Sequence, residues 1–247
     1  MKKITCIALY TMLPLLSFAQ NLVPNGSFEA NSGCPTTFSQ IANSIGWRQY
    51  HGGSSDYYNC TSSVVGAPSN AGGYQVAAEG VAYSGVITYQ PSSGYKEYIA
   101  RAITPMLIGA RYEVSISVSL ANGSGHTTTD LGVWFYDNGP TTSIIGTTAL
   151  SVTPQVAYAT RVTDTTNWVR LSATFVADSA YDNIVIGGFG SSTTTSPSAS
   201  GHASGTMATY AYYYIDSVVV KIANGINNLY ADSLICAGDT FQVPYTL

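Results

Sequence analysis

The sequence contains few charged residues, and few of these are basic. Asp, Glu, Lys and Arg make up only 9% of the 247 residues, and Lys and Arg together number 9. Without residues 1–19, which are interpreted below as a cleaved leader, 7 basic residues face 13 acidic ones and the net charge falls from -4 to -6. Proteins that neutralise nucleic-acid phosphates need clustered Lys and Arg. The composition therefore argues against a nucleic-acid partner.

The sequence also lacks the usual arrangements of catalytic and zinc-binding residues. Its three histidines, His51, His126 and His202, each lie in Gly- or Ser-rich sequence. No G-x-S-x-G motif occurs, and no H-x-x-E-H or related zinc spacing is present. We therefore predict that the chain is not an enzyme.

No segment shows a sustained helical period, and strand patterns dominate instead. Residues 111–120 alternate strictly, with Tyr112, Val114, Ile116, Val118 and Leu120 on one face. Residues 168–176 repeat the pattern, so both segments are predicted to be half-buried strands. Further predicted strands are 22–29, 84–89, 95–103, 131–136, 183–189 and 210–222. Short strands separated by Gly, Asn, Pro and Ser clusters indicate an all-β fold, an antiparallel β-sandwich of the jelly-roll type.

The first 19 residues have the pattern of a secretory signal peptide. Lys2 and Lys3 form a basic start, an apolar stretch follows, and Ser17-Phe18-Ala19 is a small-x-small cleavage site. A membrane-spanning helix is the poorer interpretation, because the run is shorter than the roughly 20 residues required and contains Pro14. We expect a secreted protein with no transmembrane segment in the mature chain.

The rest of the chain divides into one large domain and a short C-terminal remainder. Residues 20–223 are predicted to form the sandwich, 224–235 a linker, and 236–247 the first strand of a truncated second β domain. Within the sandwich, residues 190–209 are almost wholly Ser, Thr, Gly and Ala. This composition predicts a flexible loop, either a functional lid or an inert insertion.

Four cysteines are present, and Cys6 leaves with the leader. Cys34 and Cys60 are predicted to form a disulfide in an oxidising compartment, closing a loop of about 25 residues and contributing ~3 kcal/mol. Two free thiols are the alternative, and a zinc site is weaker because no C-x-x-C or nearby His pair supports it. The partner of Cys236 is expected beyond Leu247.

The order of several motifs resembles a known family. The motifs are residues 21–29 (NLVPNGSFE), Trp47, residues 168–171 (WVRL) and residues 214–218 (YIDSV). They resemble the galactose-binding-like jelly rolls, which include many carbohydrate-binding modules. A closer likeness is to large Bacteroidetes surface proteins, both gliding-motility-associated and outer-membrane-protein-A-like. It rests on three further segments: residues 54–60 (SSDYYNC), 80–85 (GVAYSG) and 95–99 (YKEYI). The resemblance spans residues 21–222.

Two carboxylates, Glu29 and Asp216, lie in the first and last predicted strands. If these strands are adjacent, the two acids can converge, and backbone carbonyls can complete an oxygen cage for Ca²⁺. The resemblance implies the same arrangement, a structural calcium that joins the ends of the domain. The alternative is that both acids cap turns or accept backbone N–H bonds. Ser217 stands where the family usually has a second acid, which weakens the metal interpretation.

An aromatic set near the two cysteines has the chemistry of a sugar-binding site. Rings can stack on the C–H faces of sugars, while Asn and Asp bind hydroxyls, and binding residues concentrate on loops. The alternative is that the rings are packed in the core. The predicted glycan-binding residues are Trp47, Tyr50, Asp56, Tyr57, Tyr58 and Asn59, with His51 beside them.

Together these features predict a secreted, non-catalytic cell-surface module for adhesion or carbohydrate binding. It would be placed on the outer surface of a Gram-negative bacterium, with a glycan or cell-surface polymer and the downstream domains of its own polypeptide as partners. One alternative is a structural spacer in a larger surface protein. Another is a module associated with a polysaccharide hydrolase, for which Asp56 and Glu97 would be the acids to test.

Overall fold

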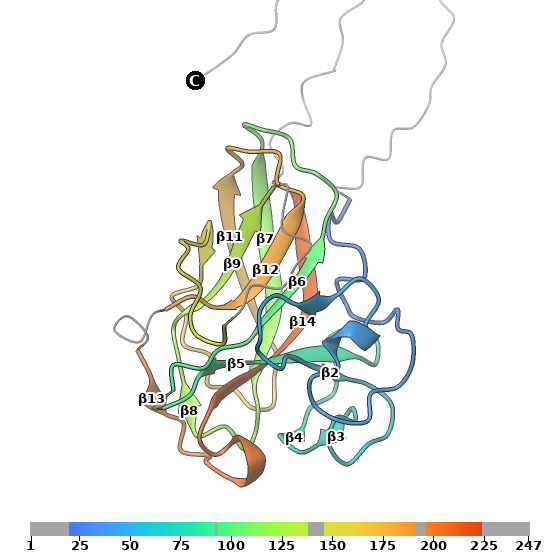
Figure 1. Cartoon of the computed structure of the whole chain (residues 1–247), viewed down its shortest axis with the longest axis vertical. Helices are drawn as coiled ribbons and strands as arrows, with labels where there is room; N and C mark the ends of the chain where they lie inside the picture. The colour runs from blue at the N-terminus through green and yellow to red at the C-terminus, as the bar shows by residue number, and fades with distance from the viewer. Residues whose placement is uncertain (1–19, 92, 138–145, 191–195, 224–247) are drawn as a thin grey trace, which may run out of the picture.

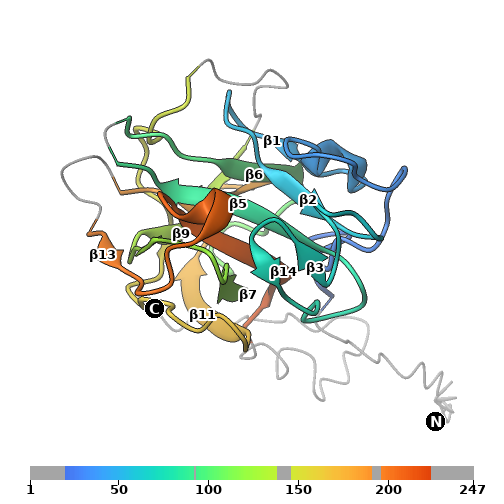
Figure 2. The ribbon, with the colours of Figure 1, turned by 90° about the horizontal axis from the view of Figure 1, so that it is seen from below.

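The protein folds as an antiparallel β-sandwich in which two five-stranded sheets face each other (Figures 1 and 2). The structure, a computed structural model, describes residues 20–91, 93–137, 146–190 and 196–223. The first sheet has the order β1 (Arg48–Gln49), β6 (Tyr98–Ala102), β12 (Asn183–Gly188), β9 (Leu131–Tyr136) and β10 (Val156–Ala157). The second has the order β11 (Val169–Val176), β7 (Arg111–Leu120), β14 (Ala211–Ile222), β5 (Tyr83–Tyr89) and β2 (Asp56–Tyr58).

Short elements complete the fold. Two strand pairs lie outside the main sheets, β13 (Ser198–Ala199) with β8 (His126–Thr127), and β3 (Ser69–Asn70) with β4 (Gly73–Tyr74). The helical elements among the described residues are two single 3₁₀ turns, η1 (Ile41–Asn43) and η2 (Gly205–Met207). None of the helices in this part of the chain has the length and apolar character needed to cross a bilayer. The prediction of an all-β jelly roll is confirmed.

The sequence alternation locates the core. Tyr112, Val114, Ile116, Val118 and Leu120 of β7 point between the sheets and are buried, as the period-2 pattern predicts. Leu171 and Phe175 of β11 join the same core. The predicted strands at 84–89, 95–103, 111–120, 131–136, 168–176, 183–189 and 210–222 correspond to β5, β6, β7, β9, β11, β12 and β14.

The serine half of the opposite face of β7 is buried too, whereas Arg111 is exposed and Glu113 is half-buried. The Arg170 guanidinium donates hydrogen bonds to the hydroxyls of Ser115 (2.6 Å) and Ser117 (3.2 Å). Ser119 donates to the Gln75 side chain over 2.9 Å. The strand was expected to be half-buried, but these polar partners cover its second face because buried hydroxyls require hydrogen bonds.

The predicted first strand at 22–29 is not a strand, although it lies beside β14 as expected. The Leu22 amide donates to the Val220 carbonyl (2.7 Å), and the Val218 amide donates to the Gly26 carbonyl (2.8 Å). The chain turns at Asn25, between these two contacts, and again at Phe28, just after them, with positive φ at both residues (48° and 64°). Residues in this left-handed region cannot continue a β ladder.

A β-bulge in β14 changes which side chains face the core. The register with β7 shifts between Asp216 and Val219, and Ser217 has a φ of 48°. Tyr213 and Ile215 point inward before the bulge, and Val218 and Val220 after it. A bulge bends a strand and redirects its side chains. Here it places Asp216 beside the segment that precedes β5.

Part of the segment 190–209, for which a flexible loop was predicted, makes defined contacts with the rest of the domain. Strand β13 pairs with β8, Arg161 donates to the Ser196 carbonyl (2.8 Å), and Met207 is buried. Residues 191–195 lie outside the described part of the chain. Contacts with β8 and Arg161 supply order that the local composition does not reveal, since tertiary partners override weak local preference.

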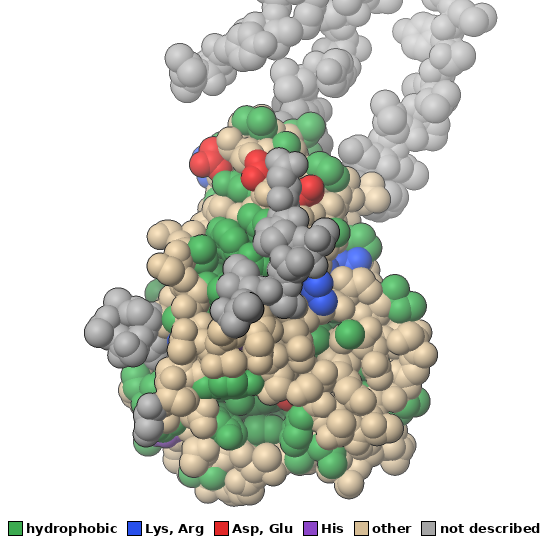
Figure 3. Space-filling view, in the orientation of Figure 1, with side chains coloured by type: hydrophobic (Ala, Val, Ile, Leu, Met, Phe, Trp, Pro, Cys, Tyr) green, Lys and Arg blue, Asp and Glu red, His purple; other side chains and the backbone are tan. Residues whose placement is uncertain are grey.

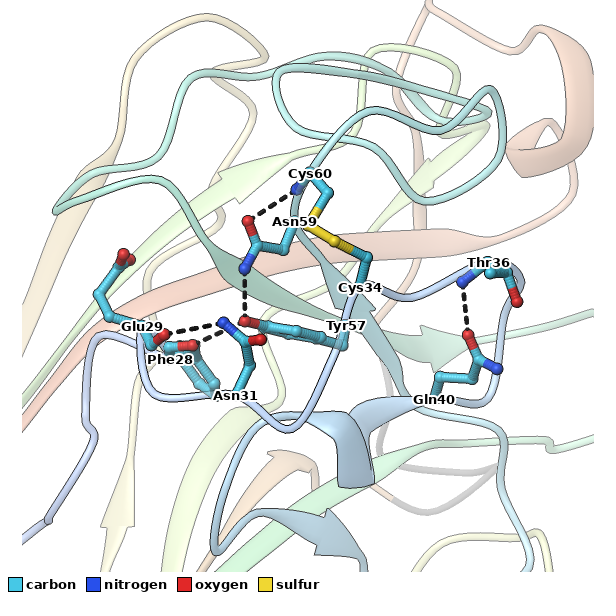
Figure 4. Close-up of a disulfide and its surroundings, with 9 residues drawn as sticks. All are labelled: Phe28, Glu29, Asn31, Cys34, Thr36, Gln40, Tyr57, Asn59 and Cys60. Carbon is cyan, nitrogen blue, oxygen red and sulfur yellow. Dashed lines mark hydrogen bonds between the residues drawn. A yellow bond between two sulfur atoms is a disulfide. The ribbon is translucent and has the colours of Figure 1, made fainter.

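The predicted disulfide is present between Cys34 and Cys60 (Figure 4). Tyr57 donates a hydrogen bond from its hydroxyl to the Phe28 carbonyl beneath the bridge, over 3.0 Å, and accepts one from the Asn59 amide group over 2.8 Å. The bridge therefore joins the N-terminal segment to the end of β2. The predicted leader (1–19), linker (224–235) and second-domain start (236–247, with Cys236) all lie outside the described residues.

Candidate binding pocket

A solvent-open pocket of about 140 Å³ lies on the outer side of the second sheet, where β2, β5 and β14 begin or end. Phe38, in the loop before η1, contributes to the wall, and so do η2 and Tyr210. Figure 3 shows a hollow lined by hydrophobic side chains in this region, with a small acidic patch at its edge. The lining residues are Phe38, Ser54, Asp56, Ile87, Glu97, Thr206, Met207, Tyr210 and Tyr212.

Asp56, the first residue of β2, lines the pocket, and only 3% of its surface is exposed. Its Oδ1 accepts a hydrogen bond from the Ser39 amide (2.7 Å), and its Oδ2 accepts one from the Tyr212 hydroxyl. The Tyr212 hydroxyl is itself 2.8 Å from the Tyr58 hydroxyl. A chain of two tyrosines therefore ends on this carboxyl group and holds it in place.

Glu97, the residue before β6, is the second buried acid of the pocket and is 1% exposed. Its Oε1 accepts from the Ser54 hydroxyl (2.6 Å), the Ser54 amide (3.2 Å) and the Tyr95 hydroxyl (3.1 Å). Its Oε2 accepts from the Ile87 amide (2.9 Å). These donors come from three separate segments, so the carboxyl group is rigidly positioned.

No Lys, Arg or His belongs to the pocket wall as described. Burial raises the pKa of Asp56 well above its usual range, and repulsion from Glu97 raises it further. Burial also raises the pKa of Glu97, opposed by its hydrogen bonds from Ser54, Ile87 and Tyr95. A charged carboxylate is disfavoured where water is excluded and no cation compensates it. The pocket is therefore a place where an incoming positive charge would be stabilised.

Of the predicted glycan-binding residues, only Asp56 lines the pocket. Trp47 is 2% exposed, stacks on Phe28 with ring centroids 4.7 Å apart, and donates from its indole to the Asn25 carbonyl (2.8 Å). Tyr57 and Tyr58 are fully buried. Their ring faces are occupied by the core and cannot stack on a sugar, which corrects the prediction for these three rings.

Tyr50 and Asn59 are also buried. Tyr50 packs edge-on against Trp134 (5.7 Å) on the outer face of the first sheet, away from Asp56. Asn59 donates to Tyr57 and accepts from the Cys60 amide (2.7 Å). The Nδ1 of His51, beside them in sequence, accepts from the Gly53 amide (3.0 Å). These residues support the local structure and do not form a joint site.

The pocket includes residues that sequence patterns did not identify as ligand contacts. Phe38 and Tyr210 are half-buried rings of the pocket wall, and Met207 and Thr206 come from η2. Glu97 was named only as an acid to test for hydrolysis. The one available signal was an acid within the strand-like residues 95–99. A carboxylate at the end of a buried strand is costly unless it has hydrogen-bond partners, so such a residue is a candidate for a polar site.

Glu29 and Asp216 approach the same loop from two sides. The Oε1 of Glu29 accepts from the amides of Val81 and Ala82, both over 3.0 Å. The Oδ2 of Asp216 accepts from the amides of Ala78 (2.8 Å) and Glu79 (3.0 Å). Burial raises the pKa of Asp216 to about 7, and the charge of Glu29 also raises it. Both acids thus act as acceptors for one loop.

These contacts bear on the predicted calcium. Ca²⁺ takes six to eight oxygen ligands, whereas the described residues contain no group of three or more His, Cys, Asp or Glu placed to hold a metal. The bonded oxygens of Glu29 and Asp216 face amide donors. The arrangement fits the alternative of backbone capping better than a closed cage. Structural calcium stays a prediction.

Asp216→Ala separates the two interpretations of this acid. The change removes the acceptor of the Ala78 and Glu79 amides. Both residues are exposed, so water can replace the acceptor, and the expected cost is about 0.5–1.5 kcal/mol for each hydrogen bond lost. We expect a lower melting temperature with or without chelator. For the wild-type protein, a melting temperature that falls on addition of EDTA and recovers with Ca²⁺ would support the metal. An Asp216→Ala protein as stable as the wild type would contradict the capping role.

No protein-family model matches the sequence, and no curated protein matches it. Solved structures similar to the chain include the CBM22-1 xylan-binding domain of Paenibacillus barcinonensis Xyn10C. It is 14% identical, with a TM-score of 0.40 over 80% of this chain and 91% of that one. A second is the C-terminal family 22 carbohydrate-binding module of Clostridium thermocellum Xyn10B, which is 16% identical, with a TM-score of 0.43 over 81% and 92%. A third is the N-terminal cellulose-binding domain of Cellulomonas fimi β-1,4-glucanase C, which is 12% identical, with a TM-score of 0.39 over 73% and 91%. At these values the likeness does not by itself assign a function.

Proposed function

We propose that this domain is a non-catalytic carbohydrate-binding module of a secreted cell-surface protein, and that the pocket beside Asp56 and Glu97 receives a sugar residue. The observation that carries the proposal is the pocket itself. It combines half-buried rings, Phe38 and Tyr210, with polar groups fixed by hydrogen bonds. Sites for small ligands have this composition, apolar walls with a few placed polar groups.

The size of the pocket limits what it can hold. A cavity of about 150 Å³ accepts a benzene ring, and this pocket measures about 140 Å³. A sugar ring is larger than benzene, so this pocket has room for part of one ring, the rest of which can extend through its open side, whereas an extended chain does not fit inside. We expect the pocket to bind a terminal sugar residue or a single residue of a branch.

The export of the protein rests on two independent features. Residues 1–19 have the pattern of a cleaved leader, and the Cys34–Cys60 disulfide is typical of oxidising compartments outside the cytosol. The resemblance to gliding-motility-associated and outer-membrane-protein-A-like Bacteroidetes proteins supports a place on the outer cell surface, where adhesion to a glycan would be the role. A structural spacer remains the alternative if no glycan binds.

A glycan array followed by calorimetry tests the proposal. The array should include xylo-, cello- and amino-sugar oligomers. We expect Tyr210→Ala to weaken binding of any sugar that scores by about tenfold, equal to about 1.4 kcal/mol, because one apolar wall is lost. Tyr74→Ala is the matched control, since Tyr74 is 59% exposed and is not part of the pocket wall.

Two outcomes would overturn the proposal. The first is that no member of the array binds, which would favour the spacer. The second is release of reducing sugar by the wild-type protein, lost in Asp56→Asn or Glu97→Gln, which would make the two acids catalytic and the domain a hydrolase.

A further inference from the structure

We propose that the pocket selects a sugar that carries a protonated amine, and that the ammonium group bonds the carboxyl group of Asp56 in the pocket that Glu97 also lines. This inference rests on the proposed function and names the ligand class of the same site. It depends on the charge, the acceptor geometry and the rings of the pocket.

The two acids of the pocket have no basic side chain beside them in its wall. Asp56 and Glu97 repel each other and are both more than nine-tenths buried, and no basic side chain contributes to the raised pKa of either. The basic residues of the described chain are engaged elsewhere. Their partners are Asp130 for Lys96, Tyr136 for Arg48, Trp47 for Arg101, Thr174 for Arg111, Ser196 for Arg161, Ser115 for Arg170 and Glu113 for Lys221.

A cation bound in the pocket would lower the pKa of both acids and stabilise their ionised forms, because an opposite charge within about 4–6 Å favours the ionised carboxyl group. A metal ion is the less suitable cation. Apart from Asp56 and Glu97, the pocket wall supplies only hydroxyl oxygens from side chains, and no group of three metal-ligating residues occurs among the described residues.

The acceptor geometry suits an ammonium group. Each oxygen of Asp56 accepts one hydrogen bond from the protein, the Ser39 amide on Oδ1 and the Tyr212 hydroxyl on Oδ2. A carboxylate oxygen has two lone pairs, so each oxygen of Asp56 can accept another hydrogen. The Oε1 of Glu97 already accepts three hydrogen bonds and its Oε2 one, so the ammonium group would bond Asp56 and be attracted by the nearby carboxyl group of Glu97. An ammonium group carries three donors and no acceptor, and hydrogen bonds between ions are about twice as strong as neutral ones.

The rings of the pocket supply the second part of the recognition. Phe38, Tyr210 and Tyr212 line the same space as the two acids. Aromatic faces attract cations and also pack against the apolar C–H face of a sugar ring. N-acetylation would remove the charge and add volume to a pocket of about 140 Å³. The site therefore favours the free amine over its acetylated form.

Calorimetry with three short ligands tests the inference. The ligands are the trimers of glucosamine, N-acetylglucosamine and glucose, used at 0.15 M ionic strength so that long-range attraction to the acidic protein is screened (about 8 Å Debye length). We expect the glucosamine trimer to bind at least tenfold more tightly than the other two. Asp56→Asn and Glu97→Gln should each weaken it about tenfold and reduce the preference.

Glu113→Gln is the matched control, because it removes the same charge at a partly exposed position outside the pocket wall. This variant should bind the glucosamine trimer as the wild type does. Equal weakening in Glu113→Gln and Glu97→Gln would show attraction to net charge only, and would overturn the inference.

A wild-type measurement covers the case in which the buried-acid variants do not fold. The amides of Ser39 and Ile87 donate directly to Asp56 and Glu97. Their NMR signals should therefore shift first and furthest when the glucosamine trimer is added. Shifts confined to other regions would overturn the assignment of the site.

The outcomes also separate this inference from the proposed function. Equal affinity for the glucose and glucosamine trimers, with shifts at Ser39 and Ile87, would retain a carbohydrate module and overturn the amine preference. Absence of binding by all three trimers and by the wider array would overturn both.

Discussion

Trp47→Ala is expected to destabilise the folded domain by about 3–5 kcal/mol, the usual cost of truncating a large buried aromatic side chain. Trp47 is 2% exposed and stacks on Phe28, and its indole N–H bonds the Asn25 carbonyl. The Arg101 guanidinium lies 5.4 Å from the ring centroid. The change therefore removes core packing, a hydrogen bond and a cation–π contact together. Urea denaturation monitored by far-UV circular dichroism measures the loss of unfolding free energy, because this signal comes from the backbone and not from the substituted tryptophan.

Trp47→Phe is the control for this prediction. It keeps an aromatic ring against Phe28 but loses the indole N–H hydrogen bond. Because the Asn25 carbonyl still accepts from the Phe28 amide (3.1 Å), we expect a smaller loss of about 1 kcal/mol, the usual net value of one hydrogen bond. Sugar affinity should be unchanged in Trp47→Phe, because the ring does not line the pocket. A Trp47→Ala protein with normal stability and lost sugar binding would restore Trp47 as a ligand contact.

Loss of the Cys34–Cys60 disulfide is expected to cost about 3 kcal/mol in unfolding free energy. The bridge joins residues 26 apart in sequence, and the stabilisation from closing a loop of this length is about 3 kcal/mol in the chain-entropy description. A change of 1 kcal/mol corresponds to roughly 2–4 °C for a domain of this size. The Cys34→Ser/Cys60→Ser protein should therefore melt about 6–12 °C below the wild type.

Reduction of the wild-type protein gives the matched measurement. Reductant should lower its melting temperature to that of the double variant and leave the double variant unchanged. The bridged segment also carries Phe38 and Asp56, two walls of the pocket, so sugar affinity should fall in parallel. An unchanged melting temperature on complete reduction would show that the bridge contributes no stability.

Local pattern predicted the larger strands well and the first segment poorly. β7 begins at Arg111 and ends at Leu120, as its alternation indicates, because side chains with a period of two can face one core only in extended chain. Residues 22–29 were predicted to be a strand, but they contain Pro24, Asn25 and Gly26 and turn at Asn25 and Phe28. Their position is set by backbone hydrogen bonds to Val218 and Val220, nearly two hundred residues away, which no local pattern encodes.

The candidate site was predictable only in part. The cysteine pair followed from redox chemistry and loop length, and Asp56 was selected with its aromatic neighbours. Whether a ring faces solvent or the core depends on the layer behind it, and Trp47 and Tyr57 are covered by the N-terminal segment. Glu97 and Met207 meet Asp56 only because β2, β5 and η2 converge on one side of the second sheet.

Three conclusions followed directly from the amino-acid sequence. Alternation of apolar side chains predicted the all-β sandwich, the two cysteines predicted the disulfide, and the scarcity of basic residues argued against a nucleic-acid partner. Each of these is a property of short stretches of chain or of overall composition. The meeting of two acids without a counter-cation in one small pocket was decided by the tertiary structure alone. The physical reason is that burial and Coulomb interaction depend on distance in space, and the residues concerned are brought together from loops, β2, β5, η2 and β14.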